Sequence, residues 1–125
     1  MGNQSVSITA GVSASNTDVV ASDFQSNTSS TAFANRDITD ITASQYHDWT
    51  LSAGGIATIS LTSVTKFAMR MSGDVDGVEP VVAAGNLPYW WCASSETSGT
   101  SQDPKLVVTY ATPDGYKNLL MTGVG

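Results

Sequence analysis

Short apolar segments recur along the chain, and in three of them, residues 5–9, 48–52 and 66–71, apolar and polar residues alternate. Alternation with a period of two is typical of strands that bury one face. Other short β-branched or aromatic runs lie at 19–21, 31–34, 56–61, 88–93 and 105–110. Turn-forming residues separate the runs at intervals of about 10–15 residues, as in sandwiches and jelly rolls. The pattern predicts an all-β fold, an antiparallel β-sandwich of jelly-roll type.

Two strands and one helix can be placed more closely. In residues 66–71 we expect the large apolar side chains, Phe67, Met69 and Met71, to face the core. The alternate side chains, Lys66, Ala68 and Arg70, are then expected on the other side of the strand. Residues 105–110 are predicted to form a central strand near the closing edge, with Leu106 and Val108 on one face. A short helix is most plausible within 53–62, although two glycines weaken it.

The domain prediction is a β-sandwich over residues 1–111 followed by a C-terminal extension over 112–125. The extension contains three consecutive large apolar residues, Leu119, Leu120 and Met121, after a Pro-Asp-Gly turn. Exposed apolar residues in a row favour association. We therefore expect the extension to dock on a neighbouring subunit as an added strand or arm.

Composition narrows the function classes. The chain has 125 residues with a formal net charge of -6, only 13% charged residues, and 17 Ser and 15 Thr. Because nucleic-acid affinity comes largely from Lys and Arg, no nucleic-acid partner is expected. No apolar run is long enough to span a membrane, and no signal peptide is recognised, so no membrane partner is expected either. A single cysteine, Cys92, excludes an internal disulfide and is expected to be a small core residue.

Several weak motifs occur in a characteristic order. Asp48-Trp49-Thr50-Leu51 precedes a Gly-Ile-x-x-Ile segment at 55–59, then Val64-Thr65-Lys66-Phe67-Ala68-Met69-Arg70, and finally Ser94-Ser95-Glu96 leads to the Pro-Lys-Leu-Val-Val-Thr-Tyr run at 104–110. This order resembles the C-terminal half of the jelly-roll domains named for an Asp-Asn-Arg-Leu-Arg-Glu signature. The stretch from Ser15 to Phe24 also looks like versions found in phage tail and other virion proteins. The resemblance covers roughly residues 5–111.

The signature itself and the first strands of that family are absent from this sequence. One interpretation is that the sandwich is incomplete without neighbouring chains, because missing strands expose sheet edges that pair with other molecules. The other is a truncated chain or a shorter, divergent sandwich. Both interpretations stay open at this point.

Three acidic residues, Asp74, Asp76 and Glu79, lie within six positions around a glycine. Calcium prefers six to eight oxygen ligands, and such a loop could supply several of them. The alternative is a solvated acidic turn, so calcium is the one cofactor that the sequence leaves open. Zinc is not expected, because one Cys and one His at unrelated positions cannot form a closed site.

The most aromatic segment contains Tyr89, Trp90 and Trp91. In a strand the two tryptophans would point to opposite faces, so one could enter the core while the other meets a subunit or stacks on a sugar. Catalysis at His47 is disfavoured, because a histidine at the start of a strand is ordinarily just exposed, and no enzymatic activity is expected.

Two functions remain. The first, which the resemblance implies, is a non-enzymatic phage-type virion structural protein: a capsid decoration, head fibre or tail component. It would assemble through its sandwich and C-terminal extension as a homo-oligomer, with a trimer favoured, together with other virion proteins in the host cytoplasm. The alternative is an extracellular carbohydrate-binding module that attaches to a polysaccharide.

Overall fold

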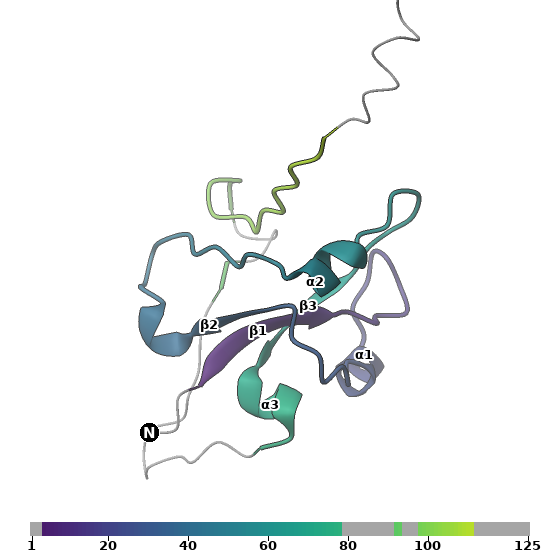
Figure 1. The fold of residues 1–125 in the computed structure, drawn as a ribbon, viewed down its shortest axis with the longest axis horizontal. Coiled ribbons are helices and arrows are strands. Elements are labelled where there is room, and N and C mark those ends of the chain that lie inside the picture. The colour runs from purple at the N-terminus through teal and green to yellow at the C-terminus, as the bar shows by residue number, and fades with distance from the viewer. Residues whose placement is uncertain (1–3, 79–91, 94–97, 112–125) are drawn as a thin grey trace, which may run out of the picture. The chain divides into compact units, whose positions relative to one another are not determined.

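The computed structural model describes residues 4–78, 92–93 and 98–111. The chain divides into two units, Met1–Trp91 and Cys92–Gly125. All helices and strands of the described residues belong to the first unit. This part is mostly β, with short helices between the strands (Figure 1).

The first unit is built on a three-stranded antiparallel sheet with the order β2-β1-β3. β1 spans Ser5–Ala10, β2 spans Ala34–Asp37 and β3 spans Phe67–Met71. The central strand β1 is buried on both faces, since Val6 and Ile8 on one face and Ser7 and Thr9 on the other are all buried. The strand predicted at 5–9 is thus confirmed, although it is covered on two sides rather than one.

Backbone hydrogen bonds fix which groups of each strand point toward its neighbour. In the register of β1 and β3, Ala10 lies opposite Phe67, so Gly11 lies opposite Lys66. The Gly11 amide donates to the Lys66 carbonyl over 2.9 Å, which makes this a hydrogen-bonded pair. Because antiparallel pairing alternates along a strand, Ala68 and Arg70 then turn their backbone groups toward β1. The backbone groups of the other β3 residues point to the outer edge of the sheet, and these residues are Phe67, Met69 and Met71.

The predicted alternation of side chains in residues 66–71 is confirmed by the pairing of β3 with β1. β3 pairs Phe67, Met69 and Met71 with Ala10, Ile8 and Val6, so these apolar side chains share one face. Their burial is less than expected, because Met69 is 39% exposed and the other two are half-buried. The opposite face is covered as well, and the Arg70 side chain there is only 13% exposed.

Four short helical segments complete the described unit: α1 at Ala21–Ser26, the 3₁₀ turn η1 at Ile38–Asp40, α2 at Ala53–Ala57 and α3 at Ser72–Asp76. α2 lies inside the predicted helix at 53–62. Its N-cap is Ser52, whose hydroxyl accepts a hydrogen bond from the Gly55 amide, as helix N-termini require. α1 begins at Ala21, the last residue of the run at 19–21, while Val20 has an extended backbone. The run forms no strand, so the strand expected there is wrong.

Residues 48–52 lie beside the sheet without joining it as a regular strand. The Trp49 Nε1 donates to the Val6 carbonyl over 3.0 Å, and the Ser52 amide donates to the Phe33 carbonyl over 2.8 Å. Phe33 in turn meets Phe67 edge-on, with ring centroids 6.3 Å apart. Trp49 is half-buried, and its indole N–H is satisfied by a backbone carbonyl of the sheet.

The predicted strand at 105–110 is wrong for this structure. Residues 104–111 carry no regular secondary structure, and no sheet ladder reaches them within the described part. The reason is physical: a strand is stable only when another strand pairs with it, and the described residues offer this segment none. A complete jelly-roll sandwich is likewise not formed by the described residues, which contain one three-stranded sheet.

Candidate assembly surface

Large apolar side chains are distributed unusually between the interior and the surface. Among the described residues, the buried apolar side chains are Val6, Ile8 and Val75. The exposed large ones are Val12, Val19, Val20, Phe24, Tyr46, Ile56, Leu61, Val64, Met69, Val78, Leu106, Val107, Val108 and Tyr110. Single exposed apolar residues are normal in soluble proteins. Beside so small a core, the described residues therefore leave a large apolar area exposed.

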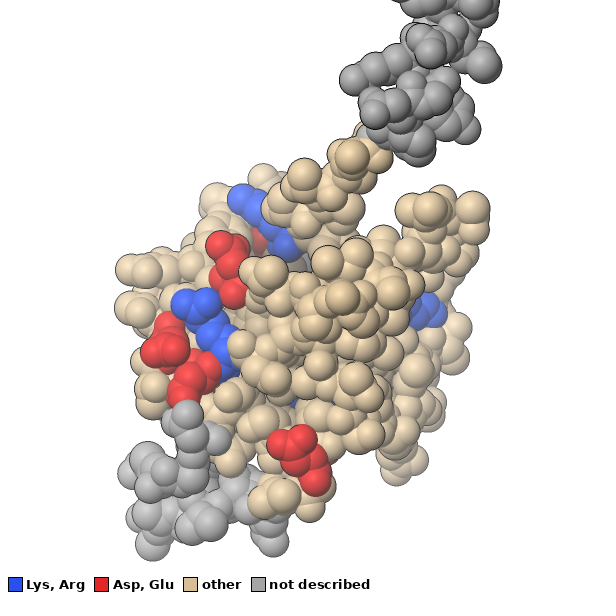
Figure 2. Space-filling view, in the orientation of Figure 1, with Lys and Arg blue, Asp and Glu red and all other residues tan. Residues whose placement is uncertain are grey.

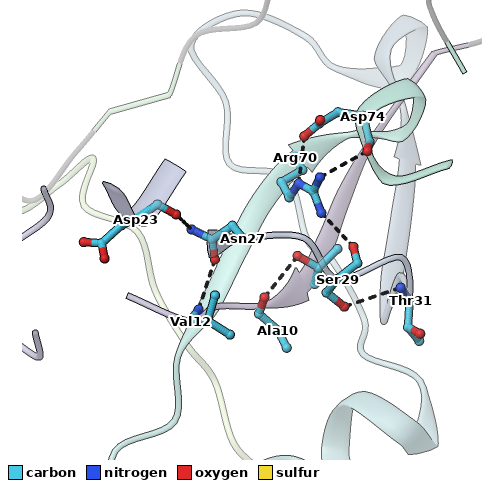
Figure 3. Close-up of polar contacts among 9 residues, drawn as sticks. Ala10, Val12, Asp23, Asn27, Ser29, Thr31, Arg70 and Asp74 are labelled. Atoms are coloured by element: carbon cyan, nitrogen blue, oxygen red, sulfur yellow. Dashed lines mark hydrogen bonds and ion pairs between the residues drawn. The ribbon is translucent and has the colours of Figure 1, made fainter. Parts of the chain in front are cut away.

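One exposed apolar group lies on α1 and the loop that precedes it. Phe24 is 86% exposed and Val19 is 79% exposed, with Val12 and Val20 about half exposed. The loop is held in place by α1. Asn27 accepts from the Val12 amide over 3.0 Å and donates its own amide to the Asp23 carbonyl over 2.8 Å (Figure 3). The apolar side chains are thus presented on a fixed backbone.

Asp23 is the centre of this polar framework and is only 3% exposed. Its two carboxylate oxygens accept from the backbone amides of Ala14 and Val20, each over 3.0 Å. The amide of Val20 lowers the pKa of the Asp23 carboxyl most, the amide of Ala14 lowers it next, and the charge of Lys66 adds to the effect against the opposing influence of burial. Two backbone amides therefore keep this buried group ionised and hold the loop closed.

Lys66, the residue before β3, also stabilises this loop. Its ammonium group donates to the carbonyls of Ser13 and Ser15, the second over 3.0 Å. The loop between β1 and α1 is therefore tied at both ends, by Asp23 from the helix and by Lys66 from the segment that leads into β3. These contacts were not predicted, although Asp23 stands at N3 of α1, where an acidic residue commonly reaches back to the N-cap amide.

A second polar cluster covers one face of β3. The Arg70 Nε donates to Asp74 over 2.7 Å, four residues ahead on α3, and Arg70 also donates to the Ser29 carbonyl over 2.7 Å (Figure 3). The guanidinium therefore joins α3 and the 28–31 loop to β3. It covers the polar face of the strand.

Charged groups form no large patch of one sign on the face shown in Figure 2. Most of the surface of the described residues there is uncharged, and basic groups lie next to acidic ones. This face therefore offers mainly uncharged groups to the solvent. This agrees with the low charge content of the chain, 13%.

The structure describes two of the three predicted calcium ligands. Asp74 and Asp76 belong to α3 rather than to an open loop, and Asp74 is engaged by Arg70. Glu79 lies outside the described residues. In the part of the chain that is described, no three His, Cys, Asp or Glu side chains gather as a metal site would need. Calcium binding here stays a prediction, with the competing arginine as its main obstacle.

The other predicted contact residues, Tyr89, Trp90, Trp91, Leu119, Leu120 and Met121, lie outside the described residues. Cys92 is described and is exposed, so its expected place in the core is wrong. His47 is half-buried, and its Nε2 lies 2.9 Å from both the amide nitrogen and the carbonyl oxygen of Thr42. This ring closes a local turn.

Comparison of the chain with models of protein families, with curated proteins and with solved structures finds no match. The jelly-roll resemblance therefore stays a prediction from the sequence. Within the ranges that the structure describes, no helix has the length and apolar character needed to cross a membrane.

Proposed function

We propose that this chain is a non-enzymatic structural module of a phage-type virion that assembles with copies of itself and with other virion proteins. The observation that carries the proposal is the contrast between a small described core and an extensive exposed apolar surface. Such a surface is stable in water when association buries it. The virion part of the proposal is supported by the resemblance of residues 5–111 to jelly-roll domains of tail and virion proteins.

The position of the exposed groups also favours a structural role. Exposed apolar residues lie on a loop that Asp23, Asn27 and Lys66 hold in one conformation. A surface that is already ordered loses little conformational entropy when a partner binds. Repeated self-association of identical subunits benefits from this, and such contacts commonly close into a symmetric ring, for which we favour a trimer.

The test is the mass of the purified chain by size-exclusion chromatography with light scattering. We expect an assembly, with three copies favoured, and we expect it to persist at high salt because apolar contacts rather than ion pairs hold it together. A monomer at micromolar concentration would contradict the proposal and would favour the carbohydrate-binding alternative. That alternative would then be tested by retention of the chain on insoluble polysaccharides.

A further inference from the structure

We propose that residues 106–110 of one chain add to the outer edge of β3 in a second copy, as a fourth strand of its sheet. This inference rests on the proposed function, since it requires that copies associate. It goes further by naming the two surfaces that meet.

The acceptor is the edge of β3 that faces away from β1. Since Ala68 and Arg70 pair with β1, the backbone groups of Phe67, Met69 and Met71 point outward. The amide and carbonyl groups of Phe67 and Met69 and the Met71 amide have no backbone partner among the residues that the structure describes. The Met71 carbonyl, at the N-cap of α3, accepts the first hydrogen bond of that helix. An edge of this kind is a template for another strand, and here no proline, bulge or outward lysine within β3 blocks it.

The donor is the segment at 106–110 in the second unit. It has a strand-like sequence, Leu-Val-Val-Thr-Tyr, but no regular secondary structure. Its large side chains are 51–84% exposed, and within the described ranges its backbone makes no hydrogen bond. A segment rich in β-branched and aromatic residues that has no strand partner is suited to pair with the free edge of a sheet.

The two surfaces match in length and in the chemistry of their faces. β3 has five residues, and so does the donor segment. In a strand, Leu106, Val108 and Tyr110 would project to one face, and Val107 and Thr109 to the other. The sheet has a corresponding division, with Met69, Ile8 and Val6 on its apolar face and small or polar side chains on the opposite one, namely Ser7, Thr9 and Ala68.

A second copy is the occupant that fits both observations at once. Among the residues that the structure describes, neither the edge nor the segment is paired with another strand, and every copy carries one of each. A contact between two different surfaces repeats from copy to copy, and it closes into a ring when the rotation between copies allows it. The preference for a trimer is consistent with such a head-to-tail ring.

Disulfide trapping between two differently substituted chains tests the proposal. Both chains carry Cys92→Ser, which removes the native thiol. One also carries Met69→Cys and the other Val108→Cys, the middle positions of the two segments, which lie opposite each other in either strand direction when the segments are centred. Cross-strand neighbours on one face are close enough for a disulfide.

We expect mild oxidation of the mixture to give a disulfide-linked dimer that neither variant forms alone. The matched control replaces Met69→Cys by Thr62→Cys, which offers an exposed thiol in the loop before β3 and should give no linked dimer with Val108→Cys. As a second measurement that needs no substitution, amide hydrogen exchange at Phe67, Met69, Met71 and 106–110 should be slow in the assembly and fast after dilution to monomers.

The outcomes separate this inference from the proposed function. An assembly by light scattering that gives no linked dimer and no protection at these amides would overturn the strand exchange while leaving the structural role intact. A monomer would overturn both. If the two cysteines placed in one chain react only with each other, the strand closes its own sheet and the second copy is excluded.

Discussion

Two adjacent glycines in α2 have different surroundings. A Cβ at Gly55 would lie 2.7 Å from the Phe33 Cβ and 3.2 Å from the Leu51 Cβ, whereas a Cβ at Gly54 would meet only the Ser52 hydroxyl, at 3.7 Å. The glycines that weakened the helix prediction thus have separate roles. Gly55 lets α2 approach the sheet, and Gly54 has space for a side chain.

We therefore expect Gly55→Ala to destabilise the fold by about 1–3 kcal/mol, because the added methyl group overpacks against Phe33. Gly54→Ala is the matched control and should be neutral or stabilising by up to about 1 kcal/mol, since alanine is the better helix former. Urea denaturation of both variants at one protein concentration gives the comparison. Equal stabilities would show that α2 does not pack closely at Gly55.

Asp23 makes stability depend on pH. Because the folded chain lowers the pKa of this carboxyl, its contribution to stability is present above the pKa of the unfolded chain and is lost as the pH falls through the lowered folded pKa. We expect Asp23→Asn to be less stable at pH 7 and to lose less stability than the unchanged chain on acidification. Thermal melts between pH 7 and pH 3 measure this. Asp18→Asn, in the same loop, should keep the acid response because Asp23 is intact.

At the scale of elements, sequence patterns identified those segments whose own residues determine their conformation. β1 and β3 alternate apolar and polar residues, and α2 carries a serine N-cap, so each has a local signal. α1 was missed because its N-cap, Val20, is β-branched, and the helix depends on Asp23 reaching back to the amide of that residue. Residues 105–110 have a strand sequence, but strand formation also requires a partner, which a local pattern cannot reveal.

The edge of β3 allows a test in which proline removes one hydrogen-bond donor at a time. The Met69 amide points outward, so Met69→Pro should leave the β1–β3 pairing in place and weaken assembly. The Ala68 amide points toward Thr9, so Ala68→Pro should instead break the sheet and unfold the unit. Met69→Ala controls for the lost side chain. Circular dichroism and light scattering separate the two effects, and an unaltered assembly in Met69→Pro would argue against an edge contact.

At the scale of the whole molecule, the low charge and the apolar segments of the sequence predict association, which stays a prediction. The sequence did not indicate which residues of the folded unit would be exposed. The Lys66 contacts and the outer edge of β3 could not be predicted, because they join residues far apart in the sequence and depend on the register of the sheet. The Asp23 contacts are local, within nine residues, and the acidic residue at N3 of α1 is a signal that could have indicated them.

The predicted role of the C-terminal extension can be tested independently of the sheet. Leu119, Leu120 and Met121 are three large apolar residues in a row, and burying each fully would stabilise a contact by about 1.5–3 kcal/mol. If they dock on a neighbouring subunit, deleting residues 116–125 should reduce the assembled mass or raise the concentration at which assembly occurs, while the far-ultraviolet β signal of the monomer persists. The triple variant Leu119→Ser, Leu120→Ser, Met121→Ser keeps the chain length and should have the same effect, because it removes the apolar contact alone. An unchanged mass in both variants would place the assembly contacts elsewhere. The edge of β3 and residues 106–110 would then be sufficient to hold the copies together.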